Sequence, residues 1–191
     1  LPAASAANLT SIPAANITGT LPAISGANLT GITTGITELD MWVMATNHSA
    51  DSGSTLNNNL NRLNTSNVSG ASAQIGTGMS KDTSTGIFTF PSTGKWLLHM
   101  TVQMYLQGDD NAGVAAVVST DGGTSYATHA LAYTGGNAGN TAQSASVFCF
   151  IDVTNTSNVK LKFQPNSLGT DSYIAGASNY IRTSFTFIRI G

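Results

Sequence analysis

The most informative segment of this chain is Gly86-Ile-Phe-Thr-Phe-Pro-Ser-Thr-Gly-Lys-Trp-Leu-Leu-His-Met100. Aromatic residues alternate with other residues up to Pro91, and the Pro-Ser-Thr-Gly step that follows is typical of a turn. From Lys95 to Tyr105, large apolar residues then recur at every second position. Successive side chains of a strand point to opposite faces of a sheet, so this alternation predicts a strand with one buried face.

The chain beyond this segment keeps the same β pattern. The Asp-Gly step in Thr120-Asp-Gly-Gly-Thr124 predicts a hairpin between strands at Val114–Ser119 and Tyr126–Tyr133. Further strands are predicted around Cys149, at Val159–Phe163 and at Thr183–Ile190, with a loop at Gln164–Asn179. Eight or more short strands, separated by turn residues and without a convincing helix, predict an all-β antiparallel sandwich.

Residues 1–36 read as one motif written about three times, for example as Leu21-Pro-Ala-Ile-Ser-Gly-Ala-Asn-Leu-Thr-Gly31. The segment has one line of aliphatic side chains and nothing bulky to pack over it. Repeats of this kind are stable only when they stack on neighbours. We therefore expect an extended stalk in which identical segments of other chains bury this line, which consists of Leu9, Ile12, Ile17, Leu21, Ile24, Leu29 and Ile32.

Residues 37–74 are predicted to hold the first strand of the globular part, within Thr37–Thr46, and a polar connection. The connection is rich in Asn and Ser and contains three leucines at the spacing of one helical turn: Leu56, Leu60 and Leu63. Because the asparagines around them are weak helix formers, an irregular loop with a short strand is favoured. Residues 75–191 are then predicted to form the globular domain.

The composition argues against several classes of protein. Charged residues make up 8% of the chain, against about 25% in ordinary soluble proteins, and the formal net charge is -2. No basic cluster is present, so we expect no nucleic-acid binding. No apolar run approaches the roughly 20 residues that span a bilayer, so we expect no membrane insertion. The single cysteine, Cys149, lies between two phenylalanines and is interpreted as a small buried apolar residue.

Two passages resemble the C1q and tumour-necrosis-factor-like jelly rolls. In that family a strand with paired aromatic residues runs through a Pro and a Gly into an aromatic-rich strand, and the matching positions are Phe88, Phe90, Pro91, Gly94 and Trp96. The closing Ser184-Phe-Thr-Phe-Ile-Arg-Ile190 is similar to the family's last strand, which lies at the trimer axis. The match covers about residues 75–191 and departs from C1q because no Tyr-x-Phe run follows the Trp. The resemblance implies a C1q/TNF-like jelly roll that forms homotrimers.

The opening repeat resembles shaft segments of tail-fibre and other virion structural proteins of tailed phages, especially marine ones. In those proteins a C1q-like tip often follows the repeat. Both resemblances imply three shafts wound together and three jelly rolls around one axis. The implied partners are therefore two further copies of the chain, with other virion proteins on the N-terminal side.

The sequence contains few residue patterns that are typical of a catalytic or metal-binding site. The histidines are not spaced with another His, Cys or carboxylate as a metal site requires, and no pair of carboxylates suited to glycan cleavage is recognisable. We therefore expect no enzymatic activity and no cofactor, with one open alternative. C1q-like trimers can bind calcium near their apex, and Asp109, Asp110 and Asn111 offer hard oxygen ligands in one loop. The simpler interpretation is that these residues solvate a turn.

Receptor contacts are expected from loops on a rigid scaffold. The candidate loops are 107–113, 134–141 and 164–179, with side chains that can hydrogen-bond to sugars or stack on them: Tyr133, Asn137, Asn140, Asn166, Asp171 and Tyr173. Each of these residues is equally compatible with an ordinary loop role.

The leading hypothesis is a non-enzymatic viral structural protein, a trimeric fibre or appendage tip that attaches a virion to a host-surface glycan or protein. One alternative is a capsid-decorating or junction protein that binds other virion proteins, and another is a cellular C1q-like binding module. A depolymerase is the least favoured. We expect the protein at the surface of the extracellular virion. Because the sequence starts at Leu1 within the repeat, we also expect it to be part of a longer protein.

Overall fold

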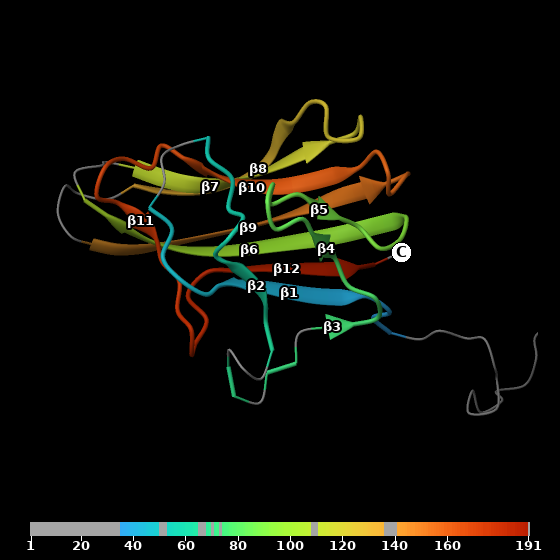
Figure 1. Cartoon of the computed structure of the whole chain (residues 1–191), viewed down its shortest axis with the longest axis horizontal. Helices are drawn as coiled ribbons and strands as arrows, with labels where there is room; N and C mark the ends of the chain where they lie inside the picture. Colours follow the sequence, from blue (N-terminus) through green and yellow to red (C-terminus); the bar gives the residue numbers. More distant parts are fainter. Residues whose placement is uncertain are drawn as a thin grey trace, which may run out of the picture. The chain divides into compact units, whose positions relative to one another are not determined.

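The computed structural model of the chain describes residues 35–49, 53–64, 68–69, 71–72, 74–107, 111–135 and 141–190. The chain divides into two compact units, Leu1–Thr33 and Thr34–Gly191, and the described residues belong to the second. The predicted stalk, with its aliphatic line from Leu9 to Ile32, lies outside the described residues and stays a prediction. The second unit is a sandwich of two antiparallel sheets (Figure 1).

The first sheet is built around a long strand that pairs on both sides. Its members are β1 (Leu39–Met44), β2 (Leu60–Arg62), β3 (Gln74–Ile75), β6 (Gly94–Leu106), β9 (Thr141–Val153), β11 (Tyr173–Ile174) and β12 (Ser184–Arg189). The strand order is β11-β6-β12-β1-β2, with β3 on β1 and β9 on β6. The pairing of β6 with β9 runs over the full length of both strands, from Gly94 opposite Val153 to Leu106 opposite Thr141.

The second sheet contains β4 (Ser80–Lys81), β5 (Phe88–Thr89), β7 (Asn111–Ser119), β8 (Ala127–Gly135) and β10 (Lys160–Asn166), in the order β4-β5-β10-β7-β8. The chain passes from one sheet to the other after β3, β5, β6, β8, β9 and β10. This repeated crossing between two antiparallel sheets is the connectivity of a jelly roll. The described residues contain no helix that is long and apolar enough to cross a membrane.

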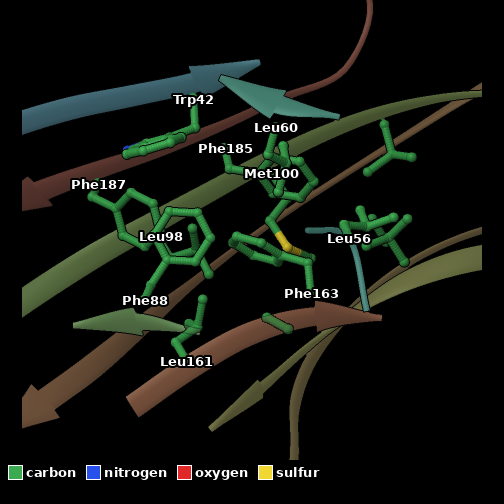
Figure 2. Close-up of a cluster of buried hydrophobic side chains, with 14 of the residues drawn as sticks. Trp42, Leu56, Leu60, Phe88, Leu98, Met100, Leu161, Phe163, Phe185 and Phe187 are labelled. Carbon is green, nitrogen blue, oxygen red and sulfur yellow. The ribbon is translucent and has the colours of Figure 1, made fainter. Parts of the chain in front are cut away.

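The core lies between the sheets and is rich in phenylalanine. On β6 the alternate residues from Trp96 to Leu106 are fully buried, which confirms the predicted alternation of that strand. Phe88 and Phe163 of the second sheet meet Phe185 and Phe187 of the first sheet (Figure 2). The ring centres of Phe163 and Phe185 are 3.9 Å apart, and those of Phe88 and Phe163 are 5.5 Å apart. These aromatic contacts join the two layers.

The region predicted as a loop at 164–179 holds more strand than expected, since β10 continues to Asn166 and β11 lies within the loop. Pro165 lies within β10 although it has no backbone N–H to donate. Its carbonyl oxygen accepts a hydrogen bond from the Gly53 amide, and Pro165 pairs with Val114 of β7. The N–H and C=O of one residue point to the same side of a strand, so the N–H that Pro165 lacks would face Gly53 and not β7. The ladder between β10 and β7 therefore loses no hydrogen bond at Pro165.

A buried carboxylate ties the edge of the first sheet together. The Asp40 side chain is 0% exposed, and its oxygens accept hydrogen bonds from Arg62 Nε at 2.8 Å and Arg62 Nη2 at 3.0 Å. Trp42 Nε1 at 2.9 Å and the Met79 amide at 2.7 Å also donate to it. A buried charge is stable only when it is paired and hydrogen-bonded, so this network holds β1, β2 and the approach to β4 in fixed positions.

Replacing Arg62 by methionine (R62M) keeps aliphatic bulk but leaves the Asp40 carboxylate without its counter-ion. We expect the free energy of unfolding to fall by about 3 kcal/mol, because a buried charge that loses its partner is strongly destabilising. Urea denaturation followed by circular dichroism measures the change. The matched control is Lys95→Met, which breaks the exposed ion pair with Asp152 and should alter stability little. Equal effects of the two substitutions would contradict this role of Asp40.

Candidate functional site

The described flanks of the three loops predicted to contact a receptor lie at one end of the sandwich, which we call the loop end. Strand register places them there: Leu106 lies opposite Thr141, Asn111 opposite Gly135, Gly113 opposite Asn166 and Tyr105 opposite Tyr173. The start of β1 at Leu39 lies opposite Ile188 and therefore at the other end (Figure 1). The chain thus enters the sandwich at the end that is remote from the candidate loops.

Two of the predicted receptor residues, Tyr133 and Asn166, lie on the second sheet opposite Gly113, together with Asn111 of the predicted calcium loop. The Tyr133 hydroxyl donates a hydrogen bond to Oδ1 of Asn111, and Asn166 is the ladder partner of Gly113. A Cβ atom on Gly113 would lie 2.5 Å from Cδ2 of Tyr133 and 2.5 Å from the carbonyl oxygen of Ala132. The glycine therefore leaves the space into which the Tyr133 ring packs.

Tyr173 lies on the other sheet and does not join this group. It stacks on Tyr105 of β6, with ring centres 4.8 Å apart and an angle of 19° between the planes. Tyr105 belongs to the face of β6 that points away from the core. Among the described residues, the predicted receptor contacts therefore divide between the outer faces of two sheets, with Tyr133 and Asn166 on one and Tyr173 on the other.

An arginine and a third tyrosine complete the group around Tyr173. Arg182 donates hydrogen bonds to the Tyr180 hydroxyl, from Nε at 3.0 Å and from Nη2 at 2.6 Å. The guanidinium carbon lies 5.2 Å from the ring centre of Tyr180 and 5.8 Å from that of Tyr105. We call Tyr105, Tyr173, Tyr180 and Arg182 the Tyr–Arg cluster.

The sequence interpretation missed most of the Tyr–Arg cluster. The predicted loop ends at Asn179, one residue before Tyr180, and the alternation of Lys95–Tyr105 predicts only a strand face for Tyr105. The one available signal was the Tyr180-Ile-Arg182 run immediately before the closing strand. That signal does not predict which strand the run will contact.

The loop that carries Asp171 is held firmly to β6. Ser172 is buried, the Gln107 amide donates to its hydroxyl at 2.8 Å, and that hydroxyl donates to the Gln107 carbonyl oxygen at 3.1 Å. Ser167 and Asp171 have φ angles of 56° and 70°, a left-handed conformation that is uncommon for residues other than glycine. Such backbone geometry persists where the surroundings determine it, and it is frequent at binding sites.

The remaining predicted site residues gain no structural support. Asp109, Asp110, Asn137 and Asn140 lie outside the described residues. Within the described part of the chain, no group of three or more His, Cys, Asp or Glu residues could hold a metal ion. Asn111 is described, and its side-chain oxygen accepts the bond from Tyr133. The calcium site therefore stays a prediction.

A hollow of about 500 Å³ opens on the second sheet. Its lining includes Ser80, Asp82, Thr85, Ile87, Thr89 and Lys160. Hydrogen bonds from the Ser84 and Thr85 side chains and amides lower the pKa of Asp82 to about 2. Lys160 Nζ donates to Thr89 Oγ1 and to the Thr156 carbonyl oxygen, both at 3.0 Å. The charged groups thus already have partners within the protein.

The outer face of the first sheet carries a contiguous apolar surface. Phe148 and Phe150 of β9 are 66% and 57% exposed, with ring centres 6.4 Å apart. Across the sheet, Phe150 lies beside Leu97, Leu97 beside Ile188 and Ile188 beside Leu39. We call these five residues the apolar face. Monomeric proteins rarely expose contiguous apolar patches of large size, and such patches mark interaction sites.

His99 lies next to this apolar face. It is the ladder partner of Phe148, its side chain is exposed, and its Nε2 lies 2.8 Å from Ser146 Oγ. His129 of β8 has its Nε2 2.9 Å from the Phe150 carbonyl oxygen. Each of the two imidazoles thus lies near the phenylalanines and makes a hydrogen bond with a residue of β9.

Comparison with known proteins identifies the fold and nothing finer. No protein-family model matches the sequence, and no curated protein matches it. Eiger TNF from S. frugiperda matches with a TM-score of 0.61 and 9% identity, over 80% of this chain and 92% of that chain. Murine APRIL at pH 8.5 matches with a TM-score of 0.53 and 11% identity, over 80% of this chain and 98% of that chain. Murine APRIL at pH 5.0 has a TM-score of 0.56 and 10% identity at the same coverage. The likeness confirms the predicted TNF-like jelly roll.

Replacing Gly113 by alanine should disrupt the group around Tyr133. The added Cβ meets a backbone carbonyl oxygen that cannot move freely, so we expect a loss of about 1–3 kcal/mol in the free energy of unfolding, as for other overpacked sites. Thermal denaturation measures it. The control is Tyr133→Phe, which removes only the hydroxyl bonded to Asn111 and should cost clearly less. A fully stable Gly113→Ala protein would contradict the packing of Tyr133 against this residue.

Proposed function

We propose that this chain is a homotrimeric, non-enzymatic binding module that forms the tip of a fibre or appendage on a virus particle and attaches it to a host surface. The observation that carries the proposal is the apolar face. Its occupant is a second copy of the chain, and the three copies stand around a common axis.

The properties of the apolar face support self-association. It contains no charged side chain, and the exposed ion pair of Lys95 with Asp152 lies at its rim. Burial of a phenylalanine side chain contributes about 2 kcal/mol. A second copy that covers Phe148 and Phe150 therefore makes the free energy of association clearly more favourable. The TNF-like fold is compatible with this mode of assembly.

The N-terminal segment supports the same stoichiometry. Its predicted aliphatic line needs neighbouring chains, and Leu39 of the apolar face follows this segment closely in the sequence. Trimerisation of the jelly rolls would bring three such segments together. Contacts between the jelly rolls would then also favour association of the N-terminal segments.

The position of the loop end supports attachment. It lies opposite the end at which β1 begins, so a particle anchored on the N-terminal side would present the loop end outward. Three sites on one axis raise the effective concentration of the second and third contacts, and weak individual sites then give strong attachment. The resemblance of residues 1–36 to phage shafts supports a virion as the particle.

Replacing Phe148 and Phe150 together by serine should convert the trimer into monomers, because the apolar surface that drives association is lost. Sedimentation velocity of the full chain measures this. The matched control is Leu131→Ser, which removes an exposed leucine on β8 of the second sheet and should leave the trimer intact. A monomeric parent protein, or a trimeric double variant, would contradict the proposal.

Antibodies raised against residues 37–191 should label the tips of fibres on purified virus particles that carry this chain, in immunogold electron microscopy. Label spread over the capsid shell would favour a decorating role. Particles without label, together with label on the surface of cells, would overturn the viral assignment.

A further inference from the structure

The Tyr–Arg cluster is a cation set among aromatic rings at the loop end. It lies on the outer face of the first sheet, beside the end of β6. Tyr180 is 46% exposed and its neighbour Ile181 is 42% exposed, while Tyr105 and Tyr173 are half-buried. The cluster is therefore anchored on one side and open to solvent on the other.

The guanidinium of Arg182 has donors to spare. An arginine carries five N–H donors. The hydrogen bonds of Arg182 to Tyr180 use Nε and Nη2, and the guanidinium also interacts with the Tyr105 hydroxyl, which leaves at least two N–H groups for a ligand. The described residues form two ion pairs, Arg62 with Asp40 and Lys95 with Asp152, and Arg182 takes part in neither. Within the described part of the chain, its positive charge thus has no carboxylate counter-ion.

The surrounding hydrogen bonds hold this charge in place. The Tyr180 hydroxyl accepts hydrogen bonds from two nitrogens of the guanidinium. The guanidinium carbon also lies 5.8 Å from the ring centre of Tyr105, which stacks on Tyr173. A guanidinium that is already positioned loses less conformational entropy when it binds a ligand. The cluster is therefore preorganised for an anion.

The residue types point to the chemistry of the ligand. Arginine forms two parallel hydrogen bonds with a carboxylate, and tyrosine and arginine are enriched among the residues that dominate binding energy. An exposed tyrosine ring can also stack on the C–H face of a sugar ring. A molecule that combines a carboxylate with a sugar ring matches both features.

We propose that the Tyr–Arg cluster binds a carboxylate-bearing saccharide, with the carboxylate on the free N–H groups of Arg182 and the sugar ring against Tyr180. The proposal rests on the attachment function proposed above and names the class of its receptor. Arg182 is the only Lys or Arg in the range 171–183, which also contains Asp171. One cation suits one carboxylate per sugar unit and is a poor match for an acidic peptide.

Isothermal titration calorimetry of the full chain tests the proposal with two probes that differ in one group. Trigalacturonic acid carries carboxylates where neutral α-1,4-galactotriose carries hydroxymethyl groups. We expect the acidic probe to bind at least about tenfold more tightly, because hydrogen bonds to a charged group are worth more than neutral ones. The measurement is made without calcium, so that chelation by the probe does not contribute.

Substitutions then assign the binding to the cluster. Arg182→Gln should weaken binding of the acidic probe by about tenfold or more, and Arg182→Lys should restore only part of it, since lysine lacks the planar fork. Tyr180→Ala should weaken it as well. The matched control is Lys162→Gln, which removes the cation 4.3 Å from the ring centre of Tyr126 on the second sheet and should change nothing.

Each alternative outcome overturns the proposal. It is wrong if the two probes bind equally, if Arg182→Gln binds like the parent, if neither probe binds, or if a glutamate-rich peptide binds in place of the saccharide. Sedimentation of the same samples separates this from the proposed assembly. If the chain is a trimer that does not bind the acidic saccharide, the proposed binding site is wrong and the proposed assembly stands. If the chain is a monomer that binds the saccharide, the proposed assembly is wrong and the binding site stands.

Discussion

The alternation of β6 between a buried and an exposed face is the constraint on which the rest of the molecule depends. One set of side chains, from Trp96 to Leu106, fills the core between the sheets. The other set necessarily points away from the core, because successive side chains of a strand lie on opposite faces. Leu97 of that second set belongs to the apolar face, and Tyr105 belongs to the Tyr–Arg cluster. A register shift of one residue would bury both and destroy the core at the same time.

The two surfaces lie on the same sheet face but are built for different partners. The apolar face offers an uncharged apolar surface, which suits a copy of the same chain. Its residues lie toward the end of the sheet at which β1 begins. The Tyr–Arg cluster offers a positioned charge with aromatic rings, which suits a small polar ligand. Between them lie polar residues of β6 and β9, such as Gln103 opposite Ser144. Assembly and recognition can therefore operate without competing for the same residues.

Hydrogen bonds that stabilise the first sheet also hold the two proposed interaction surfaces in position. The network of Asp40 with Arg62 fixes β1, and β1 carries Leu39 of the apolar face. At the other end, the Ser172 hydroxyl joins the loop after β10 to the end of β6. Both devices use hydrogen bonds to buried groups, which are costly to break and therefore rigid. A rigid scaffold with loops at one end is the arrangement on which binding proteins commonly rely.

The sequence by itself determined the all-β class, the alternation of β6, the hairpin at Asp121-Gly122 and the closing strand, because each follows from a local period of two or from turn chemistry. It also singled out Tyr133 and Asn111, which are neighbours on paired strands. Only the tertiary structure decided that Tyr173 lies apart from Tyr133, since sheet assignment depends on crossovers that leave no local signal. The meeting of Tyr105, Tyr173 and Arg182 was likewise decided by strand pairing and loop packing between segments remote in sequence, which no spacing along the chain encodes.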